Sequence, residues 1–214
     1  MRKINKKYIY TVVKKALSED LSPKGDLTTN LLDSKNQIIK AKIIAKQNGI
    51  ISGLDFCKMA FKIIGKEVIF KSKIKDGDRI KKNKIIAEIT AKTKTILIAE
   101  RTALNFLNHS SGISTYTNKF VKKVRNKTKI CCTRKTTPNL RILEKYAVNK
   151  GGGYNHRFNL SDEILIKENH INSVSNFGLN PRFFLLRVLP CLCFLGSCFT
   201  LFHSFNVRLT SRIV

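Results

Sequence analysis

Acidic residues are scarce in this sequence. The 214 residues include 14 Asp and Glu against 41 Lys and Arg, which gives a formal net charge of +27 at pH 7. An excess of this size suits nucleic acid, an anionic membrane or a highly phosphorylated small molecule. The lysines are scattered from Lys3 to Lys167 and form no single block, so a lysine-rich proteome explains the charge better than a nucleic-acid role does.

Several motifs are also missing. Residues 1–17 interleave their apolar positions with lysine, which is not the pattern of a signal peptide and predicts an amphipathic surface helix. The six cysteines match neither zinc spacing nor a disulfide framework, so a reducing cytoplasm is the expected location. Gly151–Gly153 are followed by no GK[ST] sequence, which excludes a P-loop. Asp20 and Asp26 are expected to shape a turn and cap a helix, which leaves no candidate metal ligand.

The composition changes after Ile171. Residues 172–214 contain no Lys, Asp or Glu, and seven of the 13 Phe fall there. The apolar run 183–202 has the length that a bilayer needs, but Arg187 and Pro190 interrupt it. A buried segment of a genuine domain would lack charged residues for its solvent face. We therefore interpret 172–214 as an aberrant apolar tail, the product of a frameshift or misplaced end, with a membrane anchor as the alternative.

The first half of the chain alternates apolar and polar residues over short stretches. Strands are predicted within 37–53, 68–80 and 84–100, with hairpin turns at Asn48-Gly49 and Asp76-Gly77. This pattern indicates a small α/β domain rich in antiparallel strands.

The second half reads differently. Residues 96–124 have helical spacing, with a break predicted at Ser110-Ser111-Gly112. KICCT (129–133) predicts a buried strand, Thr137-Pro138 a helix start, Gly151 the C-terminal cap of that helix, and EILIK (163–167) a second buried strand. This order of strand, helix and strand is typical of a parallel sheet or an α/β barrel.

Cationic residues gather around the predicted strand ends. Arg134 and Lys135 follow the first strand, Lys167 ends the second, and His156 and Arg157 lie in the connection after the three glycines. The carboxyl ends of barrel strands form the ligand site, so these side chains are expected to open onto one mouth. Arg forks fit carboxylate or phosphate oxygens two at a time, which predicts a ligand with several negative charges.

Each feature taken alone also has a structural explanation. The three glycines could form a flexible cap, His156 could be a structural hydrogen-bonding residue, and Arg134-Lys135 could be a solvated pair. Cys132 fits small core packing better than a nucleophile. The joint occurrence of TRK, NHR and IKENH at predicted strand ends is what favours a binding site.

Those same residues resemble a known family. TRKTTPNLRILEKYAVNKGGGYNHRFNLSDEILIKENHI (133–171) closely resembles the signature stretch of the quinolinate phosphoribosyltransferases, also called carboxylating nicotinate-nucleotide pyrophosphorylases. EDLSPKGDLTT (19–29) and AERTALNFLNHSSGIST (99–115) are similar to the family's other hallmarks. The resemblance implies an α/β protein with an α+β N-terminal sandwich domain over 1–108 and the first, incomplete part of an α/β barrel over 109–171, before the tail at 172–214.

The resemblance also implies a reaction and a site. The family transfers phosphoribosyl from phosphoribosyl pyrophosphate to quinolinate with decarboxylation, giving nicotinate mononucleotide for NAD biosynthesis, with Mg²⁺ accompanying the pyrophosphate. A cytoplasmic homodimer is implied, in which Arg101 reaches the neighbouring subunit's pocket. Lys135 and Lys167 are the implied catalytic residues. The implied substrate-binding residues are Arg101, Thr133, Arg134, Lys135, His156, Arg157 and Lys167.

The chain departs from the family's pattern after Ile171. The acidic strand ends and glycine-rich turns that the family carries further on have no match here, because no Asp or Glu follows Glu168. We hypothesise that this copy is truncated or frameshifted and inactive. Two alternatives stay open: a non-enzymatic basic fragment that binds nucleic acid, and a related phosphoribosyltransferase that takes nicotinate. On the main interpretation, neither nucleic acid nor membrane is an expected partner.

Overall fold

The computed structural model describes residues 4–31, 37–125, 127–167, 169–170, 173, 191–193 and 207–212. The helices are α1 (Lys6–Leu21), α2 (Leu27–Leu31), α3 (Leu54–Ile64), α4 (Thr93–Val124) and α5 (Arg141–Lys150). The strands are β1 (Ile38–Ala45), β2 (Gly49–Ile50), β3 (Ile69–Ser72), β4 (Arg79–Ile80), β5 (Ile85–Lys92), β6 (Lys129–Cys131), β7 (Cys191–Cys193) and β8 (Val207–Arg212). This mixture of helices and strands confirms the α/β class.

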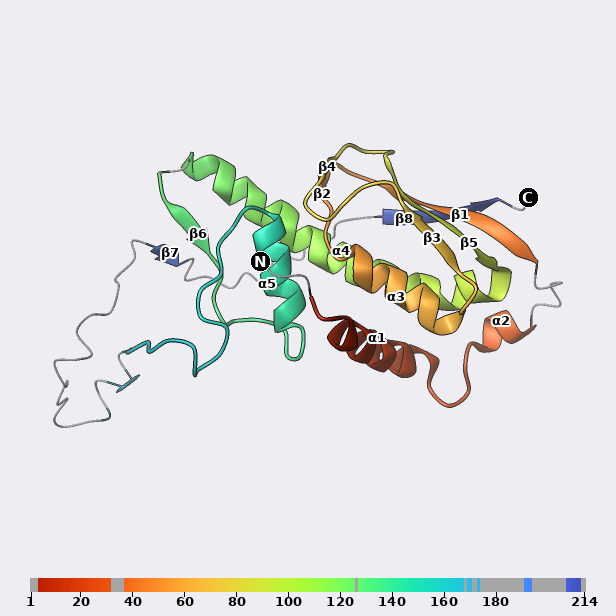
Figure 1. Cartoon of the computed structure of the whole chain (residues 1–214), viewed down its shortest axis with the longest axis horizontal. Helices are drawn as coiled ribbons and strands as arrows, with labels where there is room; N and C mark the ends of the chain where they lie inside the picture. Colours follow the sequence, from red (N-terminus) through yellow and green to blue (C-terminus); the bar gives the residue numbers. More distant parts are fainter. Residues whose placement is uncertain are drawn as a thin grey trace.

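A four-stranded antiparallel sheet in the order β3-β5-β1-β8 forms one layer of the molecule (Figure 1). In β1, Ile39, Ala41 and Ile43 are buried, while the intervening Lys40 and Lys42 are exposed. This alternation buries one face of the strand and leaves the other to solvent, as the sequence pattern predicts.

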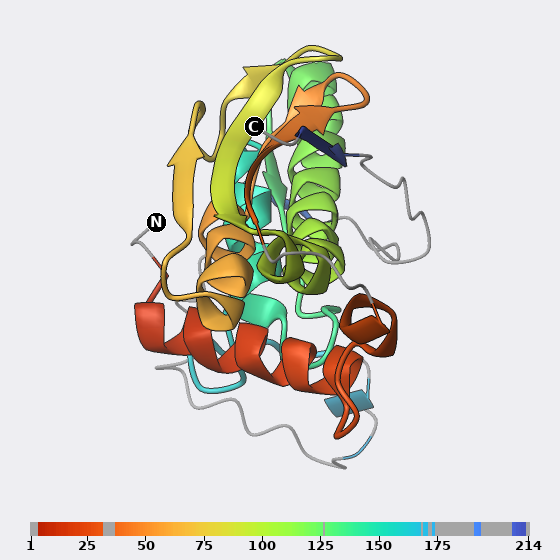
Figure 2. The same ribbon diagram turned by 90° about the vertical axis from the view of Figure 1, so that its right-hand side faces the viewer.

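Helices α3 and α4 cover the inner face of the sheet, and α1 crosses beneath them (Figure 2). Apolar residues from these layers form one core, to which α3 contributes Phe56 and Phe61 and α1 contributes Val13 and Leu17. The predicted amphipathic N-terminal helix is thereby confirmed as α1. Asp26 accepts hydrogen bonds from the amide and hydroxyl of Thr29 and so caps α2, as expected.

The predicted hairpins are wrong, although most of their strands exist. No turn at Asn48-Gly49 joins β1 to β2, because β1 pairs with β5 and β8, and β2 pairs with β4. Asp76-Gly77 does form a turn, in which Gly77 has a φ of 102°, but the β3 strand before it pairs with β5. Strand pairing here follows the buried faces of distant strands, which local turn signals do not encode.

The predicted helix break at Ser110-Ser111-Gly112 is also wrong, because α4 runs without interruption from Thr93 to Val124. The Ser110 hydroxyl donates to the Ser52 hydroxyl at 2.8 Å, and the Ser111 hydroxyl donates to the Ser52 carbonyl at 3.1 Å. These buried hydroxyls face the backbone beside β2 and do not end the helix. The predicted domain boundary between 108 and 109 lies inside α4, and the division into domains stays a prediction.

The strand, helix and parallel-strand unit exists, but its second strand is misplaced. β6 is followed by α5, and the parallel return comes at Tyr154, which forms a bridge with Cys131. Residues 163–167 were predicted as a buried strand, yet they form none, and Ile164 is 52% exposed. Helix α5 begins at Arg141, after a turn at 138–140, and ends at the predicted cap Gly151.

Only parts of the predicted tail are described. β7 pairs in parallel with β6, and β8 joins the edge of the large sheet beside β1. Val207 of β8 is buried, and its amide donates to the Asn108 side chain at 3.2 Å. Most of the apolar run 183–202 lies outside the described residues, so the interpretation of the tail stays a prediction. Within the described part of the chain, no helix is long and apolar enough to cross a membrane.

Cysteine chemistry differs from the expectation at one position. Cys131 is disulfide-bonded, which the cysteine spacing did not predict. Cys57 and Cys132 are free thiols. Burial raises the pKa of Cys57, which packs in the core on α3.

One half-buried carboxylate links the start of α3 to α5. Asp76 accepts hydrogen bonds from the amides of Gly53 and Leu54, both at 3.1 Å, at the start of α3. The Tyr146 hydroxyl of α5 donates to the same carboxylate at 2.8 Å. Burial raises the pKa of Asp76, and burial together with the charge of Asp76 raises the pKa of Tyr146. The contact fixes how α5 lies against the N-terminal layers.

Candidate anion-binding site

Two loops carry most of the predicted site residues. The TRK loop (residues 132–137) follows β6, and the NHR loop (residues 154–158) follows the three glycines after α5. Their roots are joined by backbone hydrogen bonds, since the Cys132 amide donates to the Tyr154 carbonyl at 2.9 Å and the Tyr154 amide donates to the Ile130 carbonyl at 2.8 Å. The structure therefore brings these two loops side by side, as the sequence predicted.

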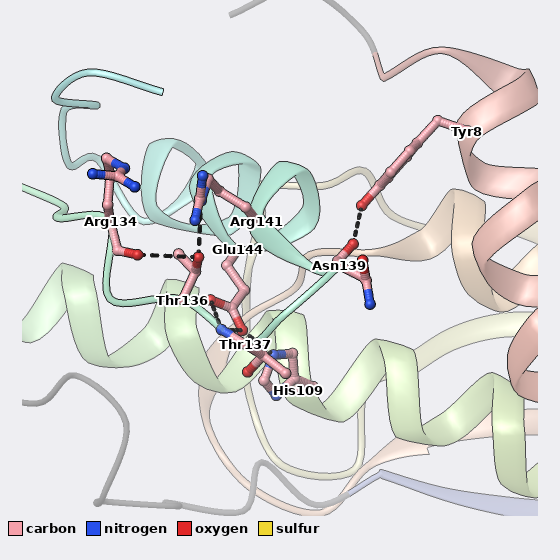
Figure 3. Close-up of polar contacts among 8 residues, drawn as sticks. All are labelled: Tyr8, His109, Arg134, Thr136, Thr137, Asn139, Arg141 and Glu144. Carbon is pink, nitrogen blue, oxygen red and sulfur yellow. Dashed lines mark hydrogen bonds and ion pairs between the residues drawn. The ribbon is translucent and has the colours of Figure 1, made fainter. Parts of the chain in front are cut away.

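In the TRK loop, Arg134 is half-buried and Lys135 is exposed. The Thr133 hydroxyl accepts from the Lys135 amide at 3.1 Å, and the Arg134 carbonyl accepts from the Thr136 amide at 2.9 Å. The Thr136 hydroxyl donates to the same carbonyl at 3.4 Å (Figure 3). These bonds hold the loop in a tight turn. The Nε atom of Arg134 is buried and has no hydrogen-bond partner among the described residues, so its N–H remains as a donor for an anionic ligand.

In the NHR loop, both cationic side chains lie near Glu163. His156 Nδ1 is 3.7 Å from a Glu163 carboxylate oxygen, and the buried Arg157 guanidinium donates to the Glu163 carbonyl at 3.0 Å. The carboxylate of Glu163 is 58% exposed, so its attraction for His156 is weak in solvent. Because this attraction is weak, a carboxylate of a ligand can displace Glu163 from His156.

The three glycines are packed against α4. A Cβ at Gly151 would lie 2.4 Å from the Ser114 carbonyl oxygen, and a Cβ at Gly153 would lie 2.8 Å from Thr117 Cγ2. Gly152 has a φ of 88°, a conformation that favours glycine. The glycines therefore serve close helix packing and a backbone turn, and together these direct the NHR loop back toward the TRK loop.

Side chains of three helices, α5, α4 and α1, also hold the TRK loop and the turn after it in place. Glu144 is 3% exposed, and its carboxylate accepts from the Thr137 amide at 3.2 Å and contacts His109 of α4 at 3.0 Å (Figure 3). The Tyr8 hydroxyl of α1 donates to the Asn139 carbonyl at 2.8 Å. Burial and then the charge of Glu144 raise the pKa of Tyr8. These side chains were not predicted as site residues, because helical spacing alone does not show which loop a helix face will support.

The two remaining predicted residues lie apart from the loops. Arg101 is exposed on α4, and no described hydrogen bond or ion pair links it to the TRK or NHR loop. Lys167 is exposed and does not end a strand, which corrects its predicted position. The Lys167 amide donates to the His170 ring at 3.0 Å and not to a neighbouring strand. Of the predicted site residues, the structure places Thr133, Arg134, Lys135, His156 and Arg157 on the two adjacent loops.

The charged groups of the two loops indicate which class of ligand they suit, a metal ion or an anion. Among the described residues, no group of three or more His, Cys, Asp or Glu could hold a metal ion. Two carboxylates contact the NHR loop: Asp162 accepts from the Phe158 amide at 2.6 Å, and Glu163 lies 3.7 Å from His156. Fold and loops together define an α/β protein in which a cationic candidate site for an anion lies beside a short parallel pair of strands.

Comparison with known proteins identifies the family. The domain described as "Quinolinate phosphoribosyl transferase, N-terminal domain" matches residues 26–111, and the C-terminal domain of the same description matches residues 113–179. The two matches follow one another in order and together span most of the chain. The chain belongs to the quinolinate phosphoribosyltransferase family.

Individual relatives agree. A probable nicotinate-nucleotide pyrophosphorylase (carboxylating) of Bacillus subtilis is 45% identical over 148 residues, which are 69% of this chain and 51% of the relative. Its namesake in Methanocaldococcus jannaschii is 44% identical over 169 residues, 78% of this chain and 58% of the relative. The solved nicotinate-nucleotide pyrophosphorylase of Francisella tularensis superimposes with a TM-score of 0.76 at 38% identity, covering 80% of this chain and 60% of that one. The chain therefore spans little more than half the length of these relatives.

Proposed function

We propose that the chain binds quinolinate between the TRK and NHR loops, and that these loops belong to an enzyme that transfers phosphoribosyl to quinolinate from phosphoribosyl pyrophosphate, with decarboxylation. That the 214 residues alone are inactive in the transfer itself stays our hypothesis, and product formation by the purified chain would contradict it. The observation that carries this proposal is the buried, unpartnered Nε of Arg134 on a loop that lies beside His156 and Arg157. The relatives named carboxylating nicotinate-nucleotide pyrophosphorylase support the same reaction. A dicarboxylate suits two adjacent cationic loops because each loop can receive one carboxylate.

The chain's own residues act mainly by positioning and by charge. With both carboxylates held, the ring nitrogen of quinolinate is directed at C1 of the ribose, which replaces a random encounter by an aligned one. Lys135 is expected to lie beside the reacting groups, where its charge stabilises the departing pyrophosphate. When the carboxylate leaves as carbon dioxide, its electron pair stays on the ring and is taken up by the quaternised ring nitrogen. Lys167 has the same role as Lys135 by resemblance, although its exposed position leaves this role resting on the family motif alone.

Magnesium enters this proposal as part of a substrate. The described residues do not fit a resident metal site, because their acidic and imidazole groups do not gather. Mg²⁺ is therefore expected to arrive on the oxygens of phosphoribosyl pyrophosphate, and no step of the chain's own chemistry is assigned to it.

Arg134→Met is expected to weaken quinolinate binding about 100-fold, because charge-assisted hydrogen bonds to a carboxylate are lost. Isothermal titration of the purified 214-residue chain measures this change. Arg79→Met is the matched control, since Arg79 is exposed on β4, away from both loops. If the parent chain binds a short oligonucleotide with a steep salt dependence and does not bind quinolinate, the proposed function is wrong. Tighter binding of nicotinate than of quinolinate would instead favour a monocarboxylate substrate.

We further propose that the active form is a homodimer in which exposed Arg101 completes the partner's pocket, in the cytoplasm as the resemblance implies. Mixing Arg101→Ala and Arg134→Ala chains is then expected to restore about a quarter of the quinolinate sites, because each mixed dimer contains one pocket with both arginines. Titration of the mixture against each variant alone measures the restored sites. No gain on mixing would place Arg101 outside the site or within its own subunit.

A further inference from the structure

Two neighbouring residues of α5 each contact both cationic loops. Arg141 and Lys145 are four residues apart, so they lie one above the other on the same face of the helix. Neither was singled out from the sequence, and neither belongs to the set of proposed substrate-binding residues. The hydrogen bonds that both side chains donate go to atoms of the two loops.

Lys145 forms the inner of the two bridges. It is 1% exposed, and its ammonium group donates to Cys132 Sγ of the TRK loop at 3.1 Å and to the His156 carbonyl of the NHR loop at 2.9 Å. The same nitrogen lies 5.9 Å from the centre of the Phe158 ring. None of the ion pairs among the described residues includes Lys145. Burying a lysine without a carboxylate partner costs free energy, which indicates that its two loop contacts serve a purpose beyond stability.

Arg141 forms the outer bridge. Its Nε donates to the Thr136 hydroxyl of the TRK loop at 3.0 Å (Figure 3), and its Nη1 donates to the Phe158 carbonyl of the NHR loop at 3.2 Å. The fork of the guanidinium fixes the direction of both bonds at once. Together the two bridges span the TRK loop from Cys132 to Thr136 and the NHR loop from His156 to Phe158.

A direct contact completes the arrangement. The Cys132 thiol, which receives the Lys145 hydrogen bond, itself donates to the Asn155 side chain at 3.3 Å. On the opposite side, Glu144 fixes the TRK loop to α4 through Thr137 and His109. The TRK loop is therefore held to the helices behind it, and the NHR loop is held at a set distance from the TRK loop.

We propose that Arg141 and Lys145 are positioning residues that set the spacing between the two cationic loops, and that this spacing makes the site selective for a vicinal dicarboxylate. The proposal rests on the proposed function. A dicarboxylate that contacts both loops needs their spacing to be correct before it binds. A monocarboxylate can bind to one loop only, so it depends far less on the spacing.

Lys145→Met tests this proposal, because methionine fills a similar volume but donates no hydrogen bond. Quinolinate affinity is expected to fall roughly tenfold or more, since pre-organisation is lost, while nicotinate affinity falls less than about threefold. Isothermal titration gives both constants. A purely structural role for Lys145 would lower the melting temperature and leave the ratio of the two affinities unchanged, and that result would overturn the proposal.

Two further variants keep the test decisive. Arg141→Gln removes the outer bridge at a half-buried position, so it serves if Lys145→Met does not fold. Tyr146→Phe is the matched control, because it removes one hydrogen bond from the same helix on the side that faces Asp76. It is expected to lower the melting temperature without changing the quinolinate to nicotinate ratio.

Hydrogen exchange separates this proposal from the proposed function. In Lys145→Met, backbone amides of both residues 132–137 and residues 154–158 are expected to exchange faster than in the parent chain. If the parent does not bind quinolinate, the proposed function fails, and exchange still decides whether the loops are coupled. Unchanged exchange in either loop would show that Lys145 does not couple them.

Discussion

Gly151→Ala is expected to destabilise the chain by about 3 kcal/mol, the upper part of the range for overpacking a well-packed contact. The added methyl group would lie 2.4 Å from the Ser114 carbonyl oxygen and 2.8 Å from Thr117 Cβ, both on α4. Backbone cannot move aside as a flexible side chain can. The hydrogen bond from the Ser114 hydroxyl to the Ala147 carbonyl and that from the Asn118 side chain to the Gly151 carbonyl would be disturbed as well. Urea denaturation measures the change in the free energy of unfolding.

Gly152→Ala is the control for this prediction. A Cβ at Gly152 would meet nothing closer than Val121 Cγ1 at 3.6 Å, so only its φ of 88° opposes alanine. That strain costs about 1–2 kcal/mol. The two variants therefore separate steric contact with α4 from backbone conformation. An effect of Gly151→Ala no larger than that of Gly152→Ala would mean that α5 shifts away from α4 at little cost.

Asp76→Ala is expected to destabilise the chain by about 3 kcal/mol, because three donors lose their acceptor together. Two of them are the Gly53 and Leu54 amides at the start of α3, and the third is the Tyr146 hydroxyl. Burial already raises the pKa of Asp76, so part of the loss is offset when the half-buried charge is removed. Thermal and urea unfolding, monitored by circular dichroism, measure the effect.

Asp76→Asn and Tyr146→Phe each remove only part of the same set of hydrogen bonds, so their effects on stability can be compared with that of Asp76→Ala. Asparagine keeps one acceptor oxygen without the charge, and phenylalanine removes only the bond from α5. The expected order of destabilisation is Ala, then Asn at position 76, then Phe at position 146, with about 1 kcal/mol for the last. A larger effect for Tyr146→Phe than for Asp76→Ala would mean that the link to α5 matters more than the cap of α3.

Local patterns predicted the elements that are buried on one side. The alternation in β1 and the interleaved apolar positions of α1 each describe a single buried face, and both elements formed as expected. The cap at Gly151 was also predicted, because a glycine run after helical spacing is a strong local signal.

The wrong predictions depend on distant partners. Ser110 and Ser111 look like a helix break until the Ser52 backbone is known to lie against them. Residues 163–167 look like a strand because they are apolar, yet a strand needs a neighbour, and among the described strands β6 pairs with β7 instead. Sequence could not supply either partner.

The sequence indicated that the two loops of the candidate site are neighbours, but it did not indicate the contacts that support them, and the roles of the loop residues stay a prediction. TRK and NHR came together because the chain returns in parallel at Tyr154, a feature that the order of elements indicated. Lys145 was missed because a lysine in a helical stretch normally lies on the surface, whereas here it is buried behind both loops.

The pairing of β8 with β1 has a consequence for how the chain folds during its synthesis. Ala45 pairs with Val207, so this edge of β1 has no partner until residues 207–212 have been translated. At about 5–20 residues per second, the ribosome adds Val207 roughly 8–30 s after Ala45. During this interval the nascent chain presents an open strand edge, beside which another chain could dock. A chaperone that binds extended segments is therefore expected to raise the yield of folded chains.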